Sequence, residues 1–189
     1  VLEFGDAVLA QLEIPLPSVE AAFRSARRRG AITILNPAPA PGVLPARVFS
    51  LSDIIVPNET EAAALAGKAP ARSEAGLFRL CQALRKKGAK SVVLTAGERG
   101  ALVMGEGRSA WVRPPGGIRP VDTTGAGDAF SGALAASLAG ESSMLDAVRF
   151  AVAAGSLSTL KRGPQDGLPG RRAIRAAAIR VRIEAIPRG

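Results

Sequence analysis

The sequence contains no histidine, no tyrosine and only one cysteine, Cys81, among its 189 residues. A single cysteine cannot form an intrachain disulfide or a cysteine-rich zinc or iron–sulfur site. Without histidine, the Ser-His-Asp triad, the Cys-His pair and the imidazole metal ligand are all excluded. Acid–base chemistry must therefore come from Asp, Glu or Lys, and a bound metal ion would be held by oxygen ligands. Cys81 lies on the apolar face of a predicted helix, so we expect it in the core.

Long apolar runs are also absent. No run approaches the roughly 20 residues that a bilayer-spanning helix needs. The first residues include Glu3 and Asp6 but no basic residue, so they do not resemble a signal peptide. The chain has no initiator methionine, and we expect it to begin within a longer protein. We therefore expect a cytoplasmic protein with no membrane partner.

Aromatic residues are few: six Phe and one Trp, which is little for a surface that stacks nucleic-acid bases. The charge is strongly basic, with 25 Lys and Arg against 16 Asp and Glu and a net charge of +9. The excess gathers at residues 27–29, at residues 86–87 and in the C-terminal part, as it does on solvated helix faces. We therefore expect no nucleic-acid partner.

The pattern of apolar residues indicates an α/β fold. Strands are predicted at residues 8–12, 31–35, 53–56 and 91–95, a hairpin at 101–104 and 109–112, and helices at 18–29, 58–65, 72–87, 126–138, 144–160 and 171–183. Short apolar strands that alternate with helices are typical of a largely parallel sheet covered by helices on both faces. With 47% apolar residues and no long linker, residues 1–189 are expected to form a single domain.

The most informative segment runs from Val121 to Phe130, where Gly125 and Gly127 precede an Ala-rich helix. Small residues at a helix start leave backbone N–H groups free, and this arrangement binds phosphate or a developing anionic oxygen. Asp128, in the first turn, could accept a proton from a substrate hydroxyl. The alternative is structural: Thr124 caps the helix and Asp128 favours the helix dipole. The segment is not a P-loop, because no Lys-Ser/Thr follows the glycines.

The stretch from Asp122 to Asp128, followed by Phe130, resembles the C-terminal signature of the pfkB carbohydrate kinases. Three more stretches fall in the order expected of the ribokinase branch of this family: Gln11-Leu12-Glu13, Asn36-Pro37-Ala38-Pro39-Ala40 and Pro57-Asn58-Glu59-Thr60-Glu61. The resemblance covers nearly the whole chain and implies a ribokinase-like fold truncated at its N-terminus. The family's N-terminal sugar-binding half, with the β-sheet lid that often pairs two subunits, is not found in the sequence.

The resemblance implies ATP-dependent phosphorylation of the primary hydroxyl of a sugar, D-ribose to D-ribose 5-phosphate. Asp128 would be the base, and the amides of Gly125, Ala126 and Gly127 would form the anion hole. Glu13, with Asp128, would contact the sugar, although local sequence alone reads Glu13 as an exposed strand end. Two other readings stay open: a different pfkB sugar or nucleoside kinase (fructokinase- or adenosine kinase-like), and a truncated non-catalytic module that binds phosphate or a partner.

The resemblance also implies how ATP and Mg²⁺ are bound. Asn58 and Glu61 would act near Mg²⁺ and the triphosphate, with Glu61 reaching the ion through water. Their spacing equally predicts a capping box. The remaining nucleotide-binding residues are expected to be Thr95, Gly97, Glu98, Gly100 and Gly127. Adenine would lie between the loop at 95–100 and the helix near residues 152–156, although that loop on its own is also typical of an ordinary turn between strands.

A monovalent cation, K⁺, is implied beside the anion hole, where it would raise the positive potential. Backbone carbonyls would supply most of its ligands. The matching positions are Asp122, Thr124, Ser158, Lys161, Gly163 and Gly167. Gly167 stands where the family commonly has Ser, and the loop at 161–167 could equally be a polar turn.

The missing half carries most of the contacts expected to the sugar and excludes water from it. We therefore expect these 189 residues alone to be weakly active or inactive, and the full-length protein to form a homodimer through its lid.

Overall fold

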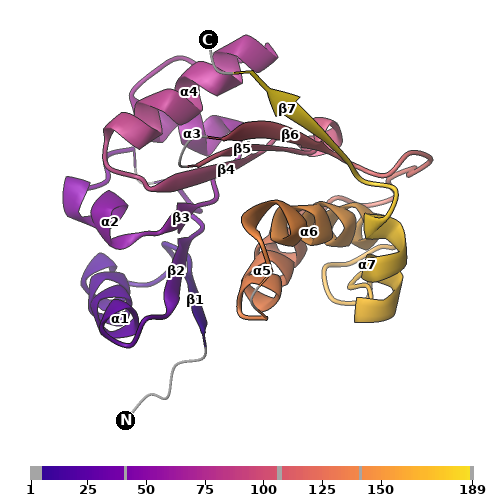
Figure 1. Ribbon diagram of the computed structural model, residues 1–189, viewed down its shortest axis with the longest axis horizontal. Coiled ribbons are helices and arrows are strands. Elements are labelled where there is room, and N and C mark those ends of the chain that lie inside the picture. The colour runs from indigo at the N-terminus through magenta and orange to yellow at the C-terminus, as the bar shows by residue number, and fades with distance from the viewer. Residues whose placement is uncertain (1–5, 41, 106–107, 141, 188–189) are drawn as a thin grey trace.

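Helices and strands alternate along the chain and build one seven-stranded sheet, shown in Figure 1. The computed structural model describes residues 6–40, 42–105, 108–140 and 142–187. The strands, in chain order, are β1 (Ala7–Ala10), β2 (Ile32–Leu35), β3 (Ile54–Ile55), β4 (Ser91–Thr95), β5 (Ala101–Met104), β6 (Ser109–Arg113) and β7 (Arg182–Ile186). Strands β1 to β4 pair in parallel, and β4 to β7 pair antiparallel.

Helices cover both faces of this sheet. One face carries α1 (Leu16–Arg28), α2 (Ala46–Leu51), α3 (Glu59–Ala66) and α4 (Glu74–Lys86), and the other carries α5 (Ala126–Leu138), α6 (Met144–Ser158) and α7 (Arg171–Ala178). Val92 and Leu94 of β4 belong to the core cluster under the first group, whereas Val93 belongs to the cluster under the second. A strand that is buried on both faces must be apolar throughout. This explains why the apolar residues of β4 follow one another without interruption. The predicted α/β fold with two covered faces is confirmed.

The parallel strands end at one edge of the sheet, and their following loops lie together there. The Asn36 N–H, after β2, donates to the Ala10 carbonyl at the end of β1, at 2.9 Å. The Leu12 N–H donates to the Ala38 carbonyl, also at 2.9 Å. Asn58 and Thr95 form a parallel bridge beyond β3 and β4. Stretches far apart in sequence are thereby brought to a common edge.

Two elements differ from the sequence prediction. Helix α2 was not predicted. The predicted helix at 171–183 is wrong in its last part, because α7 ends at Ala178 and β7 begins at Arg182. In β7 Ile183 packs against one core cluster and Ile186 against the other, and the strand is paired along β6. This pairing with a distant strand outweighs the local helical pattern.

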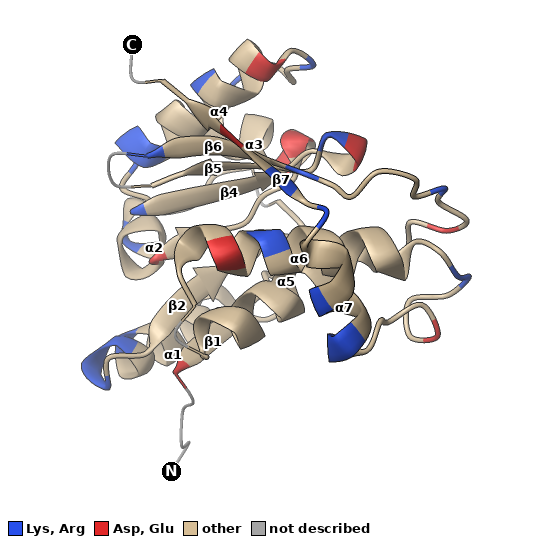
Figure 2. Cartoon of the chain, turned by 45° about the vertical axis from the view of Figure 1, so that its right-hand side comes forward, with Lys and Arg blue, Asp and Glu red and all other residues tan. Residues whose placement is uncertain are grey.

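The remaining general expectations concern Cys81, membranes and charge. Cys81 is buried in the core, as expected, and burial raises the pKa of its thiol to about 12. Within the described ranges, no helix combines the length and apolar character required to cross a bilayer. Basic residues lie on several elements, with one group on α1 and another on α7 (Figure 2). The single domain over residues 1–189 stays a prediction, because residues 1–5 and 188–189 lie outside the described residues.

Candidate active site

The start of α5 is built around Gly125. This residue is the N-cap, with a φ of 75° in the left-handed region, and no side chain caps the helix. The alternative in which Thr124 caps the helix is therefore wrong. A Cβ atom at position 125 would lie 2.8 Å from the Cβ of Pro164. Both the backbone conformation and the close approach of Pro164 require glycine here.

The first backbone amides of α5 differ in what they bind. The Ala126 N–H donates to the Thr123 carbonyl at 3.2 Å. In contrast, the N–H groups of Gly125 and Gly127 have no acceptor within the described part of the chain. Two of the three amides expected to form an anion hole are therefore open at the positive end of the helix dipole, and the third is already engaged.

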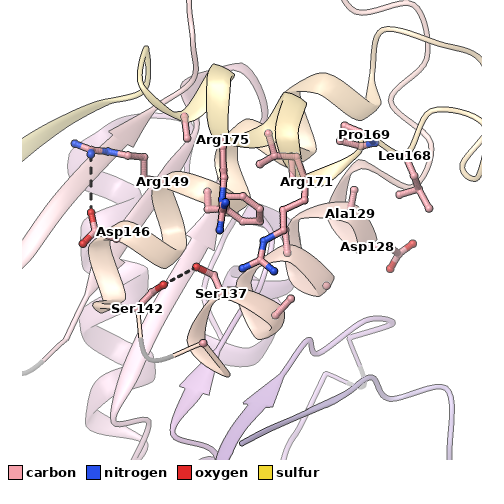
Figure 3. Close-up of a pocket in the computed structure, with 18 of the residues that line it drawn as sticks. Asp128, Ala129, Ser137, Ser142, Asp146, Arg149, Leu168, Pro169, Arg171 and Arg175 are labelled. Carbon is pink, nitrogen blue, oxygen red and sulfur yellow. Dashed lines mark hydrogen bonds and ion pairs between the residues drawn. The ribbon is translucent and has the colours of Figure 1, made fainter. Parts of the chain in front are cut away.

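Asp128 lies exposed in the first turn of α5, and Figure 3 shows its carboxylate pointing outward at one end of the helix. Its Oδ1 accepts a hydrogen bond from Nε2 of Gln11 at 2.8 Å. Its Oδ2 has no donor among the described residues. The carboxylate is therefore held at one oxygen and open at the other, as a base that receives a proton requires.

Gln11 was missed as a site residue, although it belongs to the stretch that carries Glu13. The available signal was a polar side chain directly after a parallel strand, at the edge where such sheets bind ligands. Glu13 itself is exposed in the bend after β1. Asn36 is buried, and its Nδ2 donates to Ser131 Oγ of α5 at 3.4 Å, so the loop after β2 also contacts α5.

Asp122 joins two loops at the site. Its Oδ1 accepts from the Thr124 N–H and its Oδ2 from the Gly163 N–H, both at 2.9 Å. These hydrogen bonds lower the pKa of the Asp122 carboxyl to about 2. The bond from Gly163 has the largest effect, and the bonds from Thr124 have the next largest. The segment leading into α5 is thereby fixed to the loop that places Pro164 against Gly125.

Three of the residues expected at the cation site are brought together. A Cβ at Gly167 would lie 2.5 Å from the Ser158 carbonyl oxygen and 3.1 Å from that of Gly163. A Ser side chain at position 167 therefore does not fit this backbone unless the backbone shifts. Thr124 joins the group through the Asp122 carboxylate, whereas Lys161 is exposed and has no hydrogen bond that orients it toward these oxygens within the described residues.

A cavity of about 700 Å³ joins the expected nucleotide loop to the start of α5. Its lining includes Thr95, Gly97, Glu98, Gly100, Gly127, Val152, Gly155 and Ser156. The loop and the helix expected to enclose adenine therefore face one space, and Gly127 lies at its border. Because this combination comes from four separate elements, it was only partly visible in the sequence.

Asn58 and Glu61 are not part of that lining. They form a capping box on α3, in which the Glu61 N–H donates to Asn58 Oδ1 at 2.8 Å and the Asn58 N–H donates to Glu61 Oε2 at 2.9 Å. Burial raises the pKa of Glu61. The bridge to Thr95 places this pair beside the nucleotide loop. Within the described residues, no cluster of three acidic or cysteine side chains could hold a metal ion.

Comparison with known proteins identifies the family of this chain. Residues 2–171 match the family described as pfkB family carbohydrate kinase. The chain is 39% identical to ribokinase of Haemophilus influenzae over 167 residues, which cover 88% of this chain and 54% of that protein. It thus spans about half the length of this relative.

Two solved structures are similar in fold. The structure of Arabidopsis thaliana ribokinase complexed with ribose and ATP has a TM-score of 0.82 at 28% identity, covering 92% of this chain and 55% of that one. Phosphofructokinase-2 of Escherichia coli in complex with potassium has a TM-score of 0.72 at 25% identity, with coverage of 92% and 55%. The chain belongs to the pfkB family of carbohydrate kinases.

Proposed function

We propose that the protein containing this chain transfers the γ-phosphoryl group of ATP to the primary hydroxyl of D-ribose, giving D-ribose 5-phosphate. One observation carries the proposal: the open oxygen of Asp128 and the open amides of Gly125 and Gly127 share the amino end of α5. The relative in Haemophilus influenzae, a ribokinase, and the Arabidopsis structure with ribose and ATP support the choice of substrates.

In this reaction Asp128 Oδ2 accepts the proton of the sugar hydroxyl while the hydroxyl oxygen attacks the γ-phosphorus. A new phosphorus–oxygen bond forms, the bond to the β-phosphate oxygen breaks, and ADP leaves. The amides of Gly125 and Gly127 donate to the phosphoryl oxygens as charge develops on them. The Ala126 amide, which already donates to Thr123, contributes less than was expected from the sequence.

ATP would occupy the cavity of about 700 Å³. Its base would lie between the loop at Thr95–Gly100 and α6 near Val152, and its phosphates would extend toward Gly127. Glycines in this loop allow close approach of the nucleotide to the backbone.

Mg²⁺ fits near Glu61, which has one carboxylate oxygen engaged by the Asn58 N–H and the other open. A single carboxylate without a second acidic ligand suits an ion that keeps most of its water. When bound, Mg²⁺ would neutralise charge on the phosphates. The hydrogen bond from the Asn58 N–H orients the Glu61 carboxylate. Asn58 would therefore decide how Glu61 faces the triphosphate.

K⁺ would lie beside the anion hole, where the carbonyl oxygens of Ser158 and Gly163 both approach Gly167 and the Gly163 carbonyl also accepts the Gly167 N–H. Both oxygens of Asp122 already accept backbone N–H groups, so this residue would favour the cation mainly through its charge and carbonyl. Thr124 and Lys161 would add carbonyls. The phosphofructokinase structure in complex with potassium supports a cation in this family.

The same phosphofructokinase shows that acceptors differ within the fold, so another sugar is the second candidate. Glu13, exposed in the bend two residues after Gln11, would contact the acceptor together with Asp128. We further propose a cytoplasmic enzyme that forms a homodimer through the lid of the complete protein.

The proposal is tested by assaying the complete protein with Mg-ATP and a panel of ribose, fructose and adenosine. Preferential formation of ribose 5-phosphate supports it. Preference for fructose or adenosine would move the protein to another pfkB branch, and no transfer to any acceptor, despite nucleotide binding, would favour a non-catalytic module.

A further inference from the structure

A cavity of about 940 Å³ lies between α5, α6 and α7 and the loop at residues 164–169 (Figure 3). We call it the α5–α7 cavity. Gly125 and Asp128 border it at one end, but most of its lining lies farther along α5 and on the two other helices. None of the nucleotide-loop residues lines it, so it is a separate space from the cavity proposed for ATP.

Its floor is apolar and flat. Gly132, Ala133 and Ala136 of α5 present no long side chain there. Leu168 and Ile179, with exposed fractions of 57% and 83%, stand at its borders. Small residues below and apolar side chains around leave room for a ring or a short hydrocarbon body.

Two arginines of α7 extend over this floor. Arg171 and Arg175 are one helical turn apart, and both line the cavity; Figure 3 shows their side chains reaching from α7 toward α5. Neither has a hydrogen bond or an ion pair within the described part of the chain. Apart from Asp128, Asp146 and Arg149, the other cavity residues carry no charge, and neither Arg171 nor Arg175 is paired with either carboxylate.

A third arginine adds to this imbalance. Arg149 of α6 lines the cavity, and its Nε is buried without an acceptor among the described residues. Its contact with Asp146 is long, at 3.9 Å. Arg149 thus adds a third positive charge to the lining, although its guanidinium faces Asp146 rather than Arg171 and Arg175.

The match to the family model covers only the first residue of α7. The match ends at residue 171, so Arg175 and Ile179 lie beyond it.

We propose that the α5–α7 cavity binds a small organic phosphate. The phosphate lies between Arg171 and Arg175, whose planar forks match its oxygens, and the organic body lies on the floor at Gly132–Ala136. The proposal does not depend on kinase activity, because no residue of the proposed transfer reaction is needed for it.

The test is a titration of the 189-residue chain with three probes, followed by amide and methyl NMR: phenyl phosphate, inorganic phosphate and phenol. We expect phenyl phosphate to bind best, inorganic phosphate more weakly, and phenol not at all. Resonances of Ala133, Ala136 and Ile179 should shift. Higher salt should weaken binding, because the attraction is partly electrostatic and exposed.

Matched variants separate this site from the start of α5. Arg171→Ala with Arg175→Ala should weaken phenyl phosphate binding by about tenfold or more, since charge-assisted bonds are lost. Arg172→Ala, on the same helix but outside the cavity lining, should change nothing. Unchanged affinity in the double variant, or shifts confined to the amides of Gly125 and Gly127, would overturn the proposal. Mg-ATP titration reports separately on the nucleotide cavity, so failure of one proposal does not imply failure of the other.

Discussion

The side-chain amide of Gln11 donates a 2.8 Å hydrogen bond to Asp128, a residue 117 positions later in the chain. The bond connects the end of an edge strand with the first turn of a helix on one face of the sheet. It fixes one oxygen of the carboxylate and leaves the other open. The carboxylate proposed as the base is thus held by a residue on a different element.

Replacing Gln11 by Ala should lower kcat of the complete protein by about tenfold while KM for ATP stays unchanged, because the carboxylate loses a charge-assisted hydrogen bond that orients it. Steady-state kinetics measure both constants. Gln82→Ala, an exposed glutamine of α4, is the control. Wild-type kcat in Gln11→Ala would show that the hydrogen bond has no role in orientation.

Asp128→Asn should reduce phosphoryl transfer by roughly 100- to 10,000-fold, the range expected for loss of a general base. Mg-ATP affinity should change little, because Asp128 does not line the nucleotide cavity. Calorimetry gives the affinity, and coupled assay gives the rate. An active Asn variant would remove Asp128 from the role of base.

The isolated chain of 189 residues should bind Mg-ATP but not ribose, and should show weak or no turnover. The residues proposed to enclose the nucleotide line one cavity of this chain, whereas an acceptor in a site open to water is poorly oriented. Calorimetric titration with and without K⁺ and ribose checks both parts. Rapid formation of ribose 5-phosphate by this chain alone would contradict the expectation.

Gly125→Ala should destabilise the chain by about 1–3 kcal/mol, the usual cost of a left-handed residue with a side chain, with the approach of Pro164 adding to it. Gly127→Ala is the matched control, since a Cβ there meets no atom within 4 Å and no positive φ is required. Urea unfolding measures the two free energies. Equal stability of both variants would show that the backbone at Gly125 is not constrained.

Asp122→Asn should lower the stability of the chain at pH 7, and the difference from wild type should shrink in acid. The folded pKa of about 2 lies below the ordinary value of 3.8, so the carboxylate stabilises the fold above pH 3.8 and loses this effect as pH falls toward 2. Thermal melts of both proteins at pH 7 and near pH 2.5 measure the difference. If the stability difference between the two proteins were the same at both pH values, the effect of the substitution would not come from the charge of Asp122.

Local patterns were sufficient for much of the fold. The apolar run at Ser91–Thr95 predicted β4 with the bounds observed, and the small residues before Ala126 predicted the start of α5, because periodicity and helix-start chemistry depend on neighbouring residues. The same logic failed at residues 182–186, where pairing with β6 decides the conformation.

The sequence by itself determined which residues carry the candidate chemistry: a chain without histidine, with Asp128 beside two glycines at a helix start. Only the tertiary structure decided which groups are free to act. The amide of Ala126 is engaged by Thr123, both oxygens of Asp122 are used by backbone N–H groups, and Gln11 holds Asp128. These contacts depend on strand order and on how the helices pack over the sheet, and neither is encoded in the spacing of residues along the chain.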